Sequence, residues 1–100
     1  MDDEYKKELI DVIKLFINGD YHKLEEDKLE TWNRISEVFT YYLVPAIEPD
    51  KNKGYMRYTI NPMYSDNDLT NEEKKEINFI VQHINQTIVE VTDRKLMERK

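Results

Sequence analysis

The sequence has no cysteine, only two glycines and three prolines. Without cysteine the chain has no disulfide, no thiol nucleophile and no thiolate metal site. Small secreted domains often depend on disulfides, so we expect a protein of the reducing cytoplasm. Two glycines are too few for a glycine-rich phosphate loop. The acidic start at Met1–Glu4 is unlike a signal peptide, and no apolar run is long enough for a membrane span.

The charge of the chain is negative and unevenly distributed. A length of 100 residues predicts one domain, residues 1–100, with a net charge of −6. Residues 1–50 hold 13 acids and 6 bases, whereas residues 51–100 hold 8 acids and 9 bases. Such a field repels nucleic acid and anionic membranes and attracts basic protein surfaces. Solubility alone is the competing explanation.

Hydrophobic periodicity predicts two long helices in the first half. Apolar residues of 3–18 recur on one helical face, and Gly19 follows as a C-terminal cap, with Asp20 as a cap for the next helix. A second helix is predicted from about residue 21 or 23 to Val44, where Pro45 disfavours continuation. A break within 25–30, giving two shorter helices, is the alternative.

Residues 49–69 are predicted to be irregular, because turn-forming residues dominate this stretch. Within it, 55–60 has the character of a strand, but no partner strand is evident. We therefore expect extended coil packed on a helical core. The fold predicted is all-α, a small antiparallel bundle of three or four helices.

The last helix has a sharp predicted start. Thr70 and Glu73 form a capping box, Thr-x-x-Glu, and apolar residues then continue in helical phase to about Asp93. The β-branched stretch 87–92 supports an alternative, a terminal strand paired with 55–60. The basic tail 94–100 is expected to fray.

No catalytic, metal or cofactor site is predicted. His22 and His83 are the only histidines, and neither has a second metal ligand at a suitable spacing. Asp66-Asn67-Asp68 resembles the start of a calcium loop, but Asn71 and Ile77 occupy the positions that need Gly and Glu. We therefore expect no enzyme activity, no cofactor and no metal ion.

Acidic and tyrosine residues are the remaining candidates for a binding surface. Acids attract a basic partner, and tyrosines are enriched at protein interfaces, although helix ends, turns and core packing use the same residues. The residues predicted to bind a partner are Asp27, Glu30, Glu48, Asp50, Tyr55, Tyr58, Asp66 and Asp68.

Residues 38–84 also carry an ordered set of short motifs. The set comprises Val38-Phe39, Ala46-Ile47-Glu48-Pro49-Asp50, Tyr58-Thr59-Ile60-Asn61, Leu69 and an amphipathic helix. This order resembles that of the colicin D-type immunity proteins, although the stretch 62–68 and the charged C-terminus are not part of that pattern. The resemblance implies a small helical inhibitor of a tRNA-cleaving toxin, with Glu48 and Asp50 in the basic nuclease cleft.

The expected function is therefore binding and inhibition of a cognate bacterial toxin, a tRNase-like nuclease domain whose basic active site is covered by acidic residues of this chain. We expect no direct binding of nucleic acid or membrane, because the negative field repels both. An inhibitor encoded by a phage, such as an anti-CRISPR protein, or an antitoxin would show the same features. A homodimeric helical interaction module that uses the tyrosines is the alternative of a different class.

Overall fold

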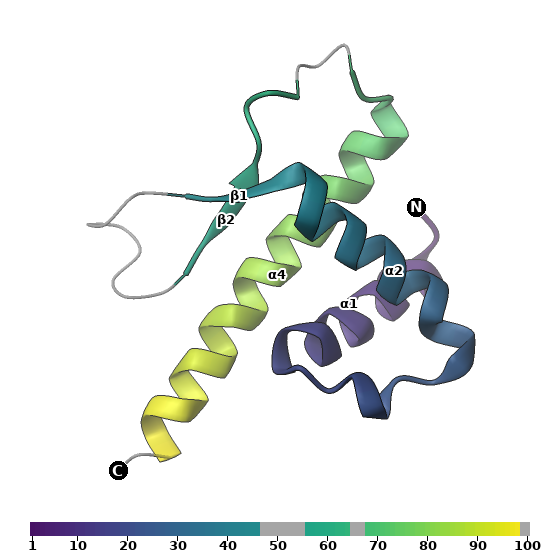
Figure 1. Cartoon of the computed structure of the whole chain (residues 1–100). Coiled ribbons are helices and arrows are strands. Elements are labelled where there is room, and N and C mark those ends of the chain that lie inside the picture. The colour runs from purple at the N-terminus through teal and green to yellow at the C-terminus, as the bar shows by residue number, and fades with distance from the viewer. Residues whose placement is uncertain (47–55, 65–67, 99–100) are drawn as a thin grey trace.

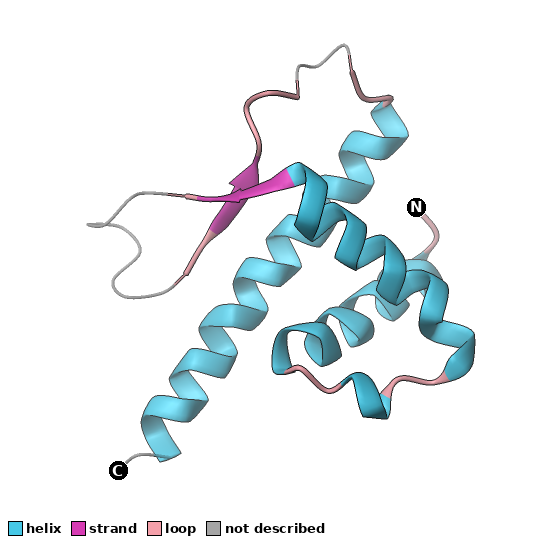
Figure 2. Cartoon of the chain, in the orientation of Figure 1, coloured by secondary structure: helices cyan, strands magenta, loops and turns pink. Residues whose placement is uncertain are grey.

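The computed structural model describes residues 1–46, 56–64 and 68–98. Three α-helices dominate it: α1 at Asp3–Asn18, α2 at Leu29–Glu37 and α4 at Asn71–Glu98 (Figure 1). Two short strands, β1 at Leu43–Pro45 and β2 at Tyr58–Ile60, form a sheet beside α4, at the end of the helical segment that follows α2 (Figure 2). The described chain is thus mostly helical, as predicted, but it also contains a small antiparallel sheet.

The first helix has the predicted bounds because its caps are local. The Asp2 side chain accepts a hydrogen bond from the Glu4 N–H at 2.8 Å. Gly19 adopts the left-handed conformation, with φ of 71°, and ends α1. The predicted cap at Asp20 is wrong, because its side chain makes no capping hydrogen bond to the 3₁₀ turn that follows. Asp20 instead lies 3.7 Å from the Lys23 ammonium.

The single helix predicted from residue 21 or 23 to 44 is wrong at both ends. Two 3₁₀ turns, Tyr21–Lys23 and Glu26–Lys28, precede α2 and are separated by extended residues. The break considered within 25–30 is therefore closer to the structure. After Glu37 the chain forms a π-helix at Val38–Tyr42 and then enters β1. The β-branched and aromatic residues of Val38–Tyr42 are weak helix formers, which favours an early end of the α-helix.

The prediction of irregular coil at 49–69 is wrong for Tyr58–Ile60. This stretch forms β2 and pairs antiparallel with β1, with Val44 opposite Thr59. Beyond the strands, the Ala46 N–H donates to the Arg57 carbonyl and the Asn61 N–H to the Tyr42 carbonyl, each at 2.8 Å. Its partner β1 was not predicted, because Leu43 and Val44 were assigned to the end of the preceding helix.

Helix α4 begins at the predicted capping box. The Glu73 N–H donates to Thr70 Oγ1 at 3.1 Å, and the Thr70 N–H donates to Glu73 Oε1 at 3.2 Å. The helix then continues to Glu98, past the predicted end at Asp93 and through the tail expected to fray. The alternative strand at 87–92 is wrong: Thr87 and Val91, four residues apart, are both buried, whereas Val89 is 38% exposed. That pattern is helical.

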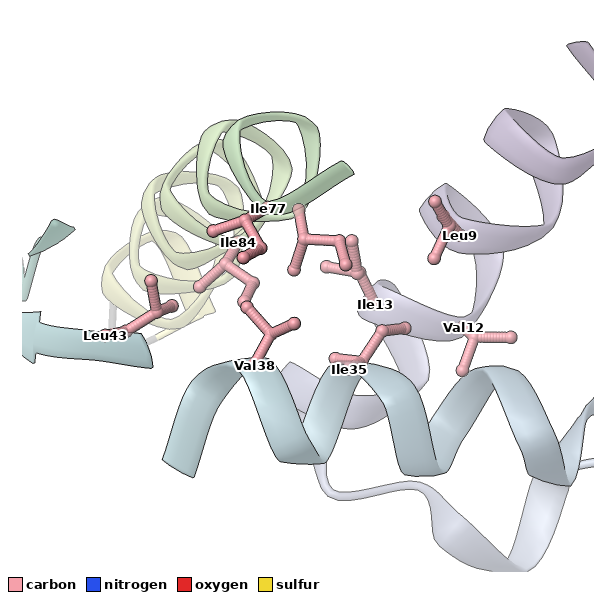
Figure 3. Packing of buried hydrophobic residues seen from close by; sticks show 9 residues of the cluster. Leu9, Val12, Ile13, Ile35, Val38, Leu43, Ile77 and Ile84 are labelled. Atoms are coloured by element: carbon pink, nitrogen blue, oxygen red, sulfur yellow. The ribbon is translucent and has the colours of Figure 1, made fainter. Parts of the chain in front are cut away.

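The core lies where α1, α2 and α4 meet. Apolar side chains from the three helices point toward one another, and Leu43 of β1 closes one side (Figure 3). The side chains with no solvent exposure are Leu9, Ile13, Ile35, Val38, Ile77, Ile80 and Ile84. This core holds the surfaces described below in fixed positions.

Candidate protein-binding surfaces

The residues predicted to bind a partner do not form one cluster in the described chain. Asp27 lies in the 3₁₀ turn before α2 and Glu30 in the first turn of α2, whereas Tyr58 lies in β2 and Asp68 precedes α4. Helix α2 and the π-helix that continues it separate the beginning of α2 from the sheet. The other predicted residues, Glu48, Asp50, Tyr55 and Asp66, lie outside the described residues.

The first candidate is an acidic surface, formed by α1 and the segment 20–30. Residues 1–30 hold ten acids and five bases. The acids exposed to solvent, which define this surface, are Asp2, Asp3, Glu4, Asp11, Glu25, Glu26, Asp27 and Glu30. The two acids that are not fully exposed, Glu8 and Asp20, each pair with a lysine.

A groove of about 470 Å³ runs through this acidic surface. It brings Glu4 and Asp11 of α1 close to Glu25 of the following segment, and Val12 and Leu15 contribute apolar groups. Lysines at 7, 23 and 28 also line it, so the groove has mixed charge. The strongest excess of acid is therefore on the surrounding exposed surface, which includes Asp27 and Glu30.

Glu8 joins α1 to the beginning of α2. Its carboxylate accepts hydrogen bonds from the Lys28 ammonium, at 2.8 Å, and from the Thr31 hydroxyl. The hydrogen bonds from Lys28 and Thr31 hold the pKa of Glu8 below its ordinary value. Thr31 is buried, so this carboxylate satisfies a buried donor and acts in the fold.

Arg34 joins α2 to α4 in a similar way. Its Nε donates to Glu76 of α4, and its Nη1 donates to Glu37 at 3.0 Å. Glu37 is more exposed than Glu76, with side-chain exposures of 49% and 21%. Glu8 and Glu76 are therefore acids that stabilise the contacts between helices, and we do not count them as part of a binding surface.

The second candidate is a tyrosine groove between the end of the π-helix, the turn after β2 and the start of α4. It has a volume of about 270 Å³. The rings of Tyr42 and Tyr64 lie 4.7 Å apart at its wall. The described residues that line it are Tyr42, Asn61, Met63, Tyr64, Asp68, Leu69 and Glu73. Among these, the two carboxylates are the groups charged at neutral pH.

Asn61 fixes the wall of the tyrosine groove. Its N–H donates to the Tyr42 carbonyl at 2.8 Å, and its carbonyl accepts from the Tyr64 N–H at 3.0 Å. Its side-chain Oδ1 accepts from the Met63 N–H, also at 3.0 Å. The turn predicted at Asn61-Pro62 thus places Tyr64 against Tyr42, a pairing that sequence spacing does not indicate.

Tyr58 has a structural environment although it was predicted to bind a partner. Its half-buried ring lies 4.8 Å from that of Phe39. Its backbone N–H donates to Asn85 Oδ1 at 2.8 Å, and its carbonyl accepts from Asn85 Nδ2 at 2.9 Å. Asn85 of α4 therefore occupies the outer edge of β2 as a neighbouring strand would. Helical periodicity alone gives no signal for this role.

The two histidines lie in different environments. His22 is exposed, and His83 lies against Phe79 with ring centroids 4.4 Å apart. Burial lowers the pKa of His83 below its ordinary value. Within residues 1–46, 56–64 and 68–98, no group of three or more acidic, histidine or cysteine side chains is arranged to hold a metal ion. None of the helices described there has the length and apolar character to cross a membrane.

No protein-family model, curated protein or solved structure matches the chain. The resemblance to colicin D-type immunity proteins therefore depends on the motifs quoted from the sequence. Of its two site residues, Glu48 and Asp50, neither is among the described residues.

Proposed function

We propose that this chain is an immunity-type inhibitor, which binds a cognate protein toxin of the nuclease class and covers its basic active site. The proposal includes the finer fold assignment, a small antiparallel bundle of helices that presents the acidic surface as a rigid body. The chain acts by binding in the cytoplasm and needs no catalytic group, cofactor or metal ion.

The observation that carries the proposal is the separation of acids by environment. The half-buried acids Glu8 and Glu76 are bound to lysine, threonine or arginine side chains inside the fold. Eight other acids of residues 1–30 are exposed. Of these, Asp2 caps α1 and Asp27 lies 4.0 Å from the Lys28 ammonium. Because all eight side chains are exposed, their charge can still attract a basic partner.

A nuclease active site is a suitable basic partner because it binds phosphate. Exposed carboxylates take the place of phosphate groups and raise the rate of association by long-range attraction. Close charge pairs across such an interface contribute roughly 1.5–7 kcal/mol in coupling energy. An inhibitor of this kind should associate more slowly as salt concentration rises.

The test is co-expression with the proteins encoded by the genes that adjoin this one. We expect one of them to stop bacterial growth when expressed alone and to be neutralised by this chain. The Asp27→Lys, Glu30→Lys double variant should lose binding by orders of magnitude, and so should Glu48→Lys, Asp50→Lys. Surface plasmon resonance at several salt concentrations measures the affinity and the association rate.

The matched control is Glu90→Lys, Glu98→Lys on α4, which changes the net charge equally at exposed positions outside the acidic surface. It should bind the toxin within a few-fold of the parent chain. If the Asp27→Lys, Glu30→Lys variant and this control bind alike, charge at the acidic surface does not direct recognition. If no adjoining gene encodes a toxic protein that the chain binds, the immunity function is wrong.

A homodimeric interaction module is the second candidate, and the end of α4 favours it. Val89, Leu96 and Met97 are 38%, 54% and 75% exposed in the last three turns of this helix. Apolar groups exposed near one another are typical of protein interfaces. Light scattering distinguishes the candidates, because a dimer held by these residues should persist at high salt and dissociate in Leu96→Lys, Met97→Lys.

A further inference from the structure

The tyrosine groove has the chemistry of a receptor for one cationic side chain. Its wall is aromatic, since Tyr42 and Tyr64 lie with ring centroids 4.7 Å apart. Its charged lining groups, among the described residues, are the carboxylates of Asp68 and Glu73. Cations bind over aromatic faces and next to carboxylates, so the two features favour the same kind of occupant.

The groove is formed by the fold before any partner binds. The Asn61 N–H ties the turn that carries Tyr64 to the Tyr42 carbonyl at the end of the π-helix, and two further hydrogen bonds, from the Met63 and Tyr64 N–H groups to Asn61, hold the turn itself. The capping box fixes Glu73 at the start of α4, through its hydrogen bonds with Thr70. Groups held in place in this way lose little conformational entropy on binding.

The size of the groove limits the occupant to one side chain. Its volume of about 270 Å³ is below the usual range for sites that enclose a whole small molecule. Met63 is 84% exposed among its lining residues, so a larger partner can contact an apolar group beside the inserted side chain. Methionine adapts its shape to different surfaces and is enriched at protein interfaces.

We propose that the tyrosine groove binds an arginine side chain of the partner protein. The planar guanidinium stacks on tyrosine rings and donates hydrogen bonds in a fork that matches a carboxylate, whereas lysine does neither. The inference rests on the proposed function in taking the partner to be a protein with a basic surface. The arginine contact would lie beyond the end of the π-helix, whereas Asp27 and Glu30 lie at the start of α2. Recognition would therefore use two separate surfaces.

The experiment uses the whole chain and short peptides as probes. The probe is acetyl-Gly-Arg-Gly-amide, compared with the same peptide containing lysine or citrulline, and the readout is the aromatic NMR signals of Tyr42 and Tyr64. The arginine peptide should shift both signals in a saturable way. The lysine peptide should bind more weakly, and the neutral citrulline peptide should leave the signals unchanged. Equal shifts with arginine and citrulline would overturn the proposal.

Variants of the groove separate binding from folding. Glu73→Gln removes one charge but keeps the capping-box hydrogen bonds, because glutamine serves at this position. Tyr64→Leu keeps an apolar side chain without an aromatic face. Each should weaken binding of the arginine peptide about tenfold. The control Glu98→Gln makes the same charge change at an exposed position near the end of α4 and should bind as the parent does.

The outcomes for the groove and for the proposed function are distinguishable. If the peptide binds the parent chain but no toxin is neutralised, the proposed function fails and the arginine site stands. If toxin binding is unchanged in Tyr64→Leu, Glu73→Gln while circular dichroism shows a folded variant, the groove is not part of recognition. If the variant is unfolded, Glu73→Gln alone is used with the peptide, and an unchanged affinity overturns the proposal.

Discussion

The junction of α1, α2 and α4 and the acidic surface use the same residue type for different purposes. At the junction, Glu8 and Glu76 are half-buried and accept hydrogen bonds from side chains of other elements. On the acidic surface, Asp27 and Glu30 are exposed, although they adjoin Lys28 and Thr31, the residues that donate hydrogen bonds to Glu8. The comparison shows that a count of acids does not locate a binding surface until the acids that stabilise the fold are removed from it.

The largest expected difference between the two regions is in the two faces of α2. Ile35 has no solvent exposure and lies in the core, whereas Glu30 of the same helix is exposed. Ile35→Ala should lower the free energy of unfolding by about 2–5 kcal/mol, because it removes buried methyl groups and leaves a cavity. Glu30→Ala should change it by about 0.5 kcal/mol or less. Urea unfolding followed by circular dichroism measures both, and equal losses would contradict the assignment of the faces.

The next difference lies between the two carboxylates that bind Arg34. Glu76→Gln should destabilise the chain by about 1–2 kcal/mol, because it removes a charge-assisted hydrogen bond between α2 and α4 at a site of low exposure. Glu37→Gln is the matched control, since Glu37 bonds the same arginine from a more exposed position. It should cost about 0.5 kcal/mol or less. A larger loss in the control than in Glu76→Gln would show that α2 and α4 do not depend on this bond.

Both ends of α1 and the start of α4 were predictable, because their signals lie within a few residues of each end. Gly19 ends α1, and the pair Thr70 and Glu73 begins α4, as predicted. The sheet was missed because its strands have three residues each and pair across a long separation in sequence. Asn85, which bonds to the backbone of Tyr58, is even more distant in sequence and was missed for the same reason.

The candidate surfaces were predictable only in composition. The sequence showed an acidic first half, but it did not show that Glu8 would be held by Thr31 while Asp27 stayed exposed. The sequence also did not indicate that Tyr64 would lie against Tyr42. That contact exists because the turn at Asn61 is hydrogen-bonded to the end of the π-helix. These facts depend on tertiary contacts between residues about twenty positions apart, where periodicity carries no information.

A smaller effect tests the Glu8 contact from its other side. Thr31 is buried and its hydroxyl donates to Glu8, so Thr31→Val should destabilise the chain by about 1 kcal/mol while keeping the shape of the side chain. Thr40→Val is the control, because Thr40 is exposed. Combined with Glu8→Gln, the Thr31 change should cost less than it does alone, since the two residues share one interaction. Strict additivity would show that they act independently.

The smallest expected effect is the dependence of stability on pH that Glu8 contributes. The pKa of Glu8 is lower in the folded chain than its ordinary value of 4.5, because Lys28 and Thr31 donate hydrogen bonds to its charged form. The unfolded chain therefore binds more protons between the two pKa values. The stabilisation is fully present above about pH 4.5 and is lost as the pH falls through the folded pKa. Glu8→Gln lacks this titration, so the stability difference between parent and variant should shrink from pH 6 to pH 3. An unchanged difference between pH 6 and pH 3 would show that the charge of Glu8 does not stabilise the fold.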